Sequence, residues 1–163
     1  MNNEKIVFKS IGIVYSPHTE LSDIPIQPVF SKGIEGKVVV ETAYVQGLQD
    51  LQSFSHIYLY YYFHRSEETH LHETPYLSNE SHGVFATRSP HRPNKLGVSL
   101  VRLIRIEGNT LFINDVDILN GTPLLDIKPY IQRFDSKEHV RSGWQDNISD
   151  EKASDKGKRN YKK

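Results

Sequence analysis

Residues 99–118 read SLVRLIRIEGNTLFINDVDI, two runs rich in branched apolar side chains on either side of Glu107-Gly108-Asn109. Such residues favour strands, and two such runs around a three-residue loop that contains glycine are typical of a β-hairpin. We therefore expect paired antiparallel strands over residues 99–106 and 110–118. The same hairpin makes an antiparallel sheet the starting hypothesis for the whole chain.

Further strand-like runs occupy residues 6–15, 37–41, 57–63 and 83–87, each bounded by turn residues. Helix signal is scarce: Val45, Leu48 and Leu51 recur at three-residue spacing, which fits one or two turns packed on a sheet. Long strands do not alternate with long helices, and no GxGxxG opens a helix, so a doubly wound nucleotide-binding fold is not expected. The pattern predicts a mainly β protein, a small antiparallel β-barrel with one or two short helices and long loops.

The composition suits one globular domain, because the 163 residues are 37% hydrophobic and 25% charged. Cysteine is absent, which excludes a disulfide framework, a cysteine zinc site and a thiol nucleophile. No apolar run approaches the ~20 residues of a membrane helix, so we expect no membrane partner and a cytoplasmic location. Twenty Lys and Arg balance twenty Asp and Glu, so net charge does not indicate the partner.

We divide the chain into a barrel domain over residues 1–145 and a basic, mobile tail over residues 146–163. The tail has only Ile148, Ala153 and Tyr161 to bury, while it carries six Lys and Arg residues. A segment with so little apolar surface cannot offset the entropy lost on ordering.

The densest motif is ATRSPHRPNKLG over residues 86–97, in which two prolines stiffen a loop that presents Arg88 and Arg92. Arginine binds carboxylate or phosphate through two parallel hydrogen bonds, so this loop is a candidate anion site. The alternative is a rigid turn with solvated arginines.

A second motif, NGTPLLDIKPY over residues 120–130, joins a turn to an extended segment. Asp126, Lys128 and Tyr130 alternate in it and therefore share one face. They could form a polar site, or equally a surface ion pair beside a tyrosine.

Four histidines, His64, His70, His72 and His82, lie close in the sequence and raise the possibility of a metal site. No cysteine or regularly spaced carboxylate completes a recognisable ligand set beside them. We therefore predict no metal.

Taken together, GVFATRSPHRPNKLGVSLV (residues 83–101) and NGTPLLDIKPY, with QGLQDLQSFSHIYLYYYFHR (residues 46–65) and IGIVYSPHTE (residues 11–20), resemble the TsaA-like family. Its bacterial member TrmO is the tRNA N6-threonylcarbamoyladenosine N6-methyltransferase. The resemblance implies a small β-barrel that binds S-adenosylmethionine, unlike the Rossmann methyltransferases. It also implies a homodimer with the site near the subunit interface, and a tRNA substrate modified beside the anticodon.

By position, the resemblance implies cofactor-binding residues in five segments: Gln27, Pro28 and Val29; His64 and Arg65; Arg88; Leu96 and Val98; and Asn120, Gly121, Thr122, Pro123 and Leu124. We take Asp126 as the candidate proton acceptor of methyl transfer, held by Lys128 and Tyr130. Arg92 and Lys95 would contact RNA phosphate or a substrate carboxylate, and the basic tail would add salt-sensitive affinity for RNA.

Two alternatives remain open. The sequence has Lys95 where the family usually reads RPNPIG, Asn120 where it reads DGTP, and Ile26 where it reads PRQ. These departures favour a methyltransferase of the same fold that acts on a small metabolite. The other alternative is a non-catalytic RNA-binding module that uses the tail and exposed aromatic side chains.

Overall fold

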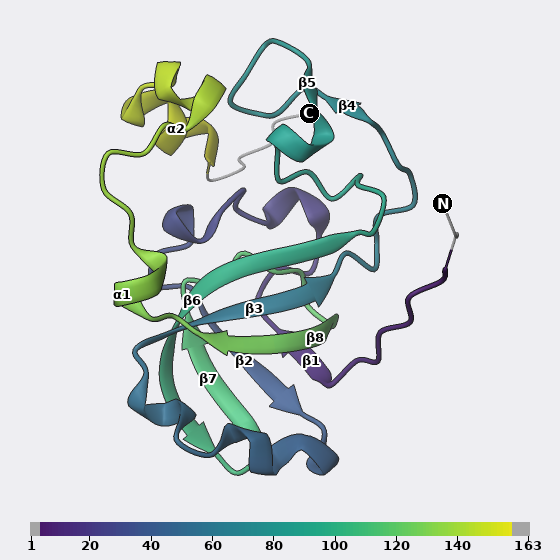
Figure 1. Cartoon of the computed structure of the whole chain (residues 1–163), viewed down its shortest axis with the longest axis vertical. Helices are drawn as coiled ribbons and strands as arrows, with labels where there is room; N and C mark the ends of the chain where they lie inside the picture. Colours follow the sequence, from purple (N-terminus) through teal and green to yellow (C-terminus); the bar gives the residue numbers. More distant parts are fainter. Residues whose placement is uncertain (1–3, 158–163) are drawn as a thin grey trace.

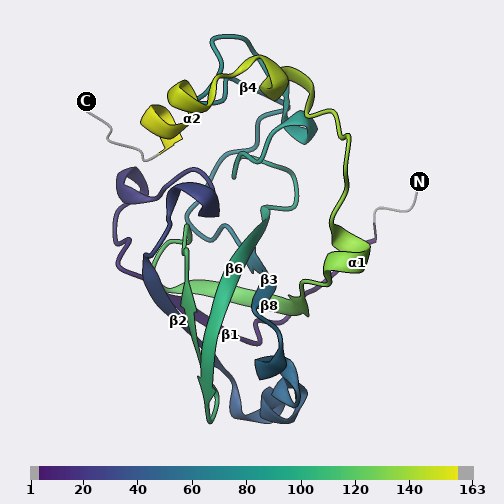
Figure 2. The ribbon, with the colours of Figure 1, turned by 90° about the vertical axis from the view of Figure 1, so that its left-hand side faces the viewer.

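The structure is a computed structural model that describes residues 4–157 (Figures 1 and 2). Its six main strands are β1 (Gly12–Tyr15), β2 (Glu35–Val40), β3 (His56–Tyr62), β6 (Leu96–Glu107), β7 (Thr110–Asn114) and β8 (Thr122–Pro129). They form a closed barrel in the order β1-β2-β7-β6-β3-β8, and every pairing is antiparallel. The prediction of a small antiparallel β-barrel is confirmed.

The hairpin of β6 and β7 lies where the apolar runs predict it. Glu107 pairs with Thr110, so the turn has two residues rather than the three expected. Gly108 takes a φ of +60°, a conformation that glycine adopts without steric cost and that tight hairpin turns require. A register shift between Leu103 and Arg105 leaves Ile104 as a bulge in β6, and bulges bend a strand.

Three predicted strands are shorter than expected. Of residues 110–118, only Thr110–Asn114 form a strand, β7. Of residues 6–15, only Gly12–Tyr15 pair, and of residues 83–87 only Gly83 does, in the two-stranded sheet of β4 (His72–Glu73) and β5 (His82–Gly83). The 3-10 turn η5 (Val84–Ala86) follows, because the Thr87 backbone N–H and its hydroxyl both donate to Val84 O, at 3.1 and 2.9 Å.

The helices are short. The helical spacing of Val45, Leu48 and Leu51 corresponds to the 3-10 segments η3 (Thr42–Leu48) and η4 (Leu51–Ser53). The remaining helices are η1 (Leu21–Asp23), η2 (Pro28–Phe30), α1 (Gln132–Asp135), η6 (Gly143–Asn147) and α2 (Asp150–Gly157). Among residues 4–157, no helix has the length and apolar composition needed to cross a membrane.

Residues 146–157, expected to belong to a mobile tail, pack instead on the loops above the barrel (Figure 2). Just before this segment, the Trp144 ring stacks on His82 with centroids 4.7 Å apart, and its Nε1 donates to Ala86 O at 2.9 Å. At the end of α2, Gly157 O accepts from Ile26 N at 3.0 Å. Composition alone could not reveal these contacts, because their partners lie far away in the sequence. Residues 158–163 lie outside the described part of the chain.

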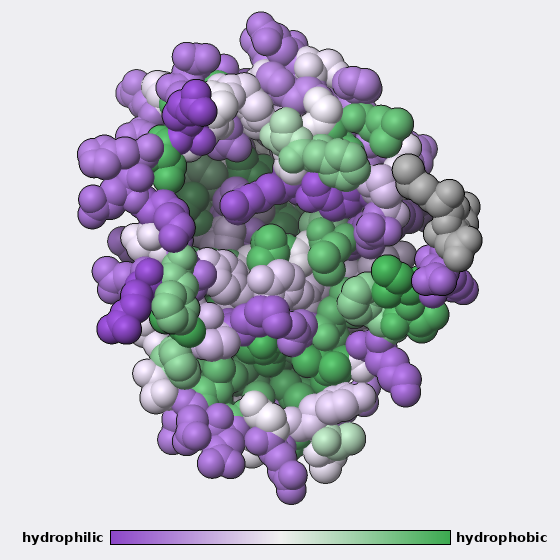
Figure 3. Space-filling model, in the orientation of Figure 1, coloured by the Kyte–Doolittle hydropathy of each residue, from purple (hydrophilic) through white to green (hydrophobic). Residues whose placement is uncertain are grey.

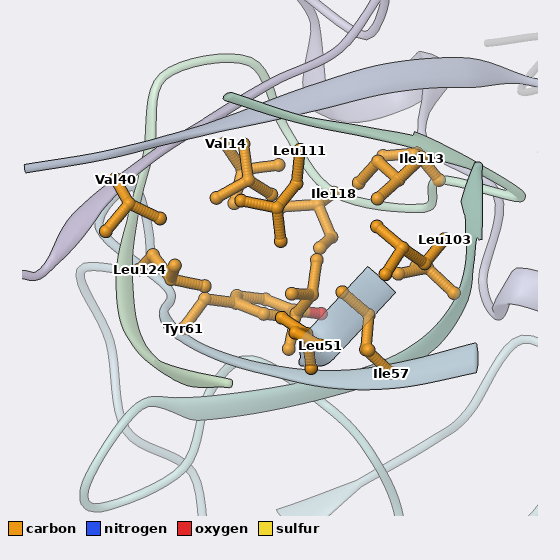
Figure 4. Close-up of a cluster of buried hydrophobic side chains, with 14 residues drawn as sticks. Val14, Val40, Leu51, Ile57, Tyr61, Leu103, Leu111, Ile113, Ile118 and Leu124 are labelled. Atoms are coloured by element: carbon orange, nitrogen blue, oxygen red, sulfur yellow. The ribbon is translucent and has the colours of Figure 1, made fainter. Parts of the chain in front are cut away.

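The barrel core is made of branched side chains that point inward from all six strands and from the β7–β8 connection (Figure 4). Ile57, Leu59 and Val101 have no exposed surface. Gly97 is the inward residue at the start of β6, and a Cβ there would lie 2.3 Å from the ring of Tyr61. Because Gly97 has no side chain, the Tyr61 ring has room to pack against the backbone at the start of β6.

Replacing Leu59 by alanine should lower the free energy of unfolding by about 2–5 kcal/mol, because it removes a fully buried side chain and leaves a cavity. Urea denaturation followed by circular dichroism measures this. Leu71, 64% exposed, is the matched control, and Leu71→Ala should cost under about 0.5 kcal/mol. Equal losses for the two variants would contradict the assigned core.

Candidate functional site

A cleft lies at one end of the barrel, where β3 ends, β6 begins and the β7–β8 connection crosses. Its empty volume is about 930 Å³, part of which is open to solvent. In Figure 3, apolar side chains come into view in the recess between the barrel and the hydrophilic segments stacked on it. The walls combine three kinds of residue: aliphatic (Leu21, Ile24, Ile26, Leu96, Val98, Ile118 and Leu119), cationic or imidazole (His64, Arg65, Arg88, His91 and Arg92) and buried polar (Tyr61, Asp117 and Thr122).

A buried chain of hydrogen bonds forms the floor. Ser99 Oγ donates to Asp117 Oδ1 at 2.6 Å, and Tyr61 OH lies 3.1 Å from Ser99 Oγ. Because the single Ser99 proton goes to the carboxylate, Tyr61 must donate to Ser99. Burial and then the nearby Asp117 raise the pKa of Tyr61, so the phenol keeps its proton. The floor is thus a polar chain that runs from a phenol to a carboxylate.

The cationic rim joins loops that are distant in sequence. The Arg88 guanidinium donates to Gln27 Oε1, which connects residues 61 positions apart. Arg92 donates to the backbone carbonyls of Val84 and Thr87, at 3.2 and 3.3 Å, and so holds its own loop. Arg65 is exposed at the rim. The rim can therefore offer Arg65 and Arg88 to an anionic group.

His64 stands at this rim between apolar and cationic surroundings. Desolvation, and after it the positive charge of Arg65, lower the pKa of His64 below its ordinary value. The imidazole is accordingly neutral at pH 7, so one of its ring nitrogens donates a hydrogen bond and the other accepts one.

Seven of the thirteen residues expected to bind the cofactor line this cleft: Gln27, His64, Arg65, Arg88, Leu96, Val98 and Thr122. The arginine–proline loop and the Gly121-Thr122 turn therefore meet at one cleft. Their assignment to a cofactor remains a prediction.

The other six do not line the cleft. Leu124 is fully buried in the barrel core, and the apolar wall of the cleft is formed by Leu96, Val98, Ile118 and Leu119. Pro123 pairs with Ile13 of β1, and Gly121, at φ +78°, donates its N–H to Val14 O. Asn120 Oδ1 accepts from Ser16 N at 3.2 Å. Pro28 and Val29 lie in η2, where the Val29 side chain is 74% exposed.

The residues expected to act in catalysis lie outside the cleft, where Asp126 and Lys128 contact each other. Asp126 Oδ2 is 2.8 Å from Lys128 Nζ, and both side chains are about half exposed on the outer face of β8. The Tyr130 ring is 6.0 Å from that of Tyr58. Asp126 also lines a second hollow, with Leu48, Phe54 and Pro129. Within one chain, the geometry is that of a surface ion pair beside a tyrosine.

The residues expected to contact substrate are engaged with backbone. Lys95 Nζ donates to the carbonyls of Ser66 and Glu67, as Arg92 does to its own loop. Both cations would have to exchange these contacts for an anion.

Sequence reasoning missed the floor of the cleft. Asp117 offered a signal, since a carboxylate inside the apolar run VDIL is rarely buried without a partner or a function. Ser99 and Tyr61 offered none, because the pairing of β3 with β6 brings these two together and the folded β7–β8 connection then places Asp117 against Ser99.

Comparison of this chain with known proteins agrees with its fold and its motifs. Residues 13–136 match the model of the tRNA-methyltransferase O N-terminal domain. A probable S-adenosyl-L-methionine-binding protein of Pyrococcus abyssi is 52% identical over 155 residues, 94% of this chain and 84% of its own. The human tRNA (adenine(37)-N6)-methyltransferase is 41% identical over 96 residues, 57% of this chain and 22% of its own. The crystal structure of TrmO from Pseudomonas aeruginosa superposes with a TM-score of 0.73 at 34% identity, covering 86% of this chain and 63% of that one.

The His64 side chain should titrate with a midpoint below 6.5, as measured by NMR of its ring protons. Because the pKa is lower in the folded state, its neutral form contributes stability above pH 6.5, and this contribution is lost as pH falls through the folded-state pKa. Arg65→Met should move the midpoint upward. A parent midpoint at or above 6.5 would contradict the assignment.

Proposed function

We propose that this chain, which belongs to the tRNA-methyltransferase O family, transfers a methyl group from S-adenosylmethionine to N6 of the adenosine beside the tRNA anticodon. Membership is shown by the match over residues 13–136. The cofactor expected from the sequence agrees with the name of the Pyrococcus abyssi relative, and the tRNA substrate with that of the human relative. We infer a cytoplasmic location from this role.

The convergence of two distant motifs on one cleft carries the proposal. Arg88 of the arginine–proline loop and Thr122 of the Gly-Thr turn line the same hollow, although 34 positions separate them. The cleft has a mainly apolar wall with a few charged and polar groups, which is the lining typical of small-molecule sites. Such a lining suits a nucleoside-like ligand that carries charged groups.

The lining fits the three chemical parts of S-adenosylmethionine, which supplies an electrophilic methyl group when bound. Arg65 and Arg88 would hold its carboxylate. The aliphatic wall around Leu96 and Val98 would pack on its adenine. The Asp117 carboxylate at the floor suits a cationic centre, because buried opposite charges attract strongly.

The substrate would approach over the outer face of the barrel next to the cleft. Tyr62 and Tyr60 of β3 pair with Leu96 and Val98 of β6, which line the cleft. The two tyrosines therefore form a row of aromatic side chains next to the edge of the cleft. Unpaired bases of RNA are bound by stacking on aromatic side chains. This row therefore suits the unstacked adenosine of an anticodon loop.

We propose that Asp126 accepts the N6 proton, held in place by Lys128. Asp126 pairs with Tyr60, which pairs with Val98, so it lies two strand spacings, about 10 Å, from the cleft edge. That distance is too long for direct proton transfer within one chain. The assignment therefore includes a homodimer, in which Asp126 would serve the cleft of the second subunit.

The finer substrate, N6-threonylcarbamoyladenosine, brings a carboxylate of its own. Arg92 and Lys95 would bind it only after releasing the backbone carbonyls that they now contact.

A small-metabolite methyltransferase is the second candidate, because of the conformation of Lys95. Its φ of +50° is one that proline, fixed near about −65°, cannot adopt. The loop at Lys95, directly before the cleft residue Leu96, therefore has a backbone shape that the usual RPNPIG sequence could not form. RNA binding that weakens steeply with salt would exclude the metabolite alternative.

Arg88→Met should weaken S-adenosylmethionine binding at least about tenfold in isothermal titration calorimetry, since a hydrogen bond to a charged group contributes roughly 1.5–3 kcal/mol. Arg105→Met is the matched control, because Arg105 pairs with Glu107 in β6 away from the cleft. No binding to the parent at millimolar cofactor would favour the RNA-binding module instead.

Purified protein should add one methyl group to threonylcarbamoyladenosine in tRNA, as read by mass spectrometry of nucleosides. Asp126→Asn should slow this reaction about 10²-fold or more, the usual contribution of a general base, with tRNA binding unchanged. Asp155→Asn, an exposed change in α2, is the control. Methylation at the parent rate by Asp126→Asn would refute the role of Asp126 and leave the methyltransferase proposal standing.

A further inference from the structure

Three side chains that the proposed reaction does not use meet beside the cleft. Glu73 Oε1 lies 2.9 Å from His70 Nδ1 and 2.9 Å from His91 Nδ1. A ligand atom from each of the three residues lies within 4.8 Å of the other two. Two imidazole nitrogens and one carboxylate oxygen at such distances can surround a single small cation.

The arrangement behind His70 is that of a metal ligand. Its other ring nitrogen, Nε2, faces Glu68 Oε2 at 2.8 Å. A metal-bound histidine commonly donates its second ring N–H to a carboxylate, which fixes the ring and strengthens the ligand. Glu68 is thus positioned to orient His70 from outside the coordination sphere.

The backbone holds the three ligands in place. His70 N donates to His91 O at 3.0 Å, and Glu73 is fixed by the pairing of β4 with β5. The Glu73 side chain is only 16% exposed, which shields its carboxylate from bulk water. The cluster is therefore organised by contacts that do not themselves require an ion.

We propose that His70 Nδ1, Glu73 Oε1 and His91 Nδ1 bind a divalent transition-metal ion of the zinc class. Nitrogen ligands disfavour Mg²⁺ and Ca²⁺, which prefer oxygen, and imidazole suits Zn²⁺, Ni²⁺ and Co²⁺. Water completes a four-coordinate site. The histidines that were considered as metal ligands in the sequence did not reveal these three ligands, because His91 and Glu73 come together only in the folded chain.

The ion would join two loops at the cleft rim. His70 and Glu73 belong to the connection after β3, whereas His91 belongs to the arginine–proline loop and itself lines the cleft. A bound ion would fix this loop relative to the barrel. The inference concerns metal binding by the chain and does not depend on the proposed methyl transfer.

Tag-free, metal-stripped protein should bind one Zn²⁺ per chain in isothermal titration calorimetry. His70→Asn and Glu73→Gln should each weaken binding at least tenfold, and Glu68→Gln about 10- to 100-fold, the range for losing such a supporting carboxylate. His72→Asn and Glu67→Gln are matched controls, since both residues are exposed neighbours outside the cluster, and they should bind as the parent does.

Histidine ring NMR of the unmutated chain makes the test independent of how the variants fold. Added Zn²⁺ should shift the resonances of His70 and His91 and leave those of His72 and His139 unchanged. Absence of binding at millimolar Zn²⁺ would overturn the proposal. So would binding that persists in the double variant His70→Asn with Glu73→Gln, or shifts confined to other histidines, because the ion would then lie elsewhere.

Discussion

The pairing of β1 with β8 closes the barrel, and the rest of the structure depends on it. Gly12 opposes Leu124 at this seam, and Gly12 lies so close to β2 that a Cβ would be 2.4 Å from Val39 O. Closure removes both sheet edges and brings the ends of β3 and β7 and the starts of β6 and β8 to one end of the barrel. The segments joined to these strand ends then have to share the space above that end, and the cleft forms among them.

Local chemistry made most of the barrel predictable. Branched residues with a turn glycine at Gly108 set the hairpin, and the aromatic run of β3 is a strand of the expected length, shifted by one residue. Segments whose partners are distant were not predictable. One such segment is α2, which depends on a hydrogen bond between Gly157 and Ile26, and another is η6, whose Trp144 stacks on His82.

Part of the candidate site could be predicted from the sequence, again because it depends on local chemistry. Motifs identified the loops that meet at the cleft, since stiffened arginines and a Gly-Thr turn carry recognisable chemistry. They could not show on which side of the sheet each residue lies. A register shift between Tyr60 and Tyr61 against β8 leaves Leu124 inside the barrel and Asp126 outside it. One residue of register therefore separates a core leucine from a surface carboxylate.

The packing of α2 on the loop at Ile26 and of Trp144 on His82 has an evolutionary consequence. Substitutions in residues 143–157 can change the width of the cleft without altering any residue that touches a ligand. The barrel would remain intact under such substitutions, because none of its strands includes these residues. Substitutions in residues 143–157 can therefore change which ligand is preferred among related proteins whose strands remain the same.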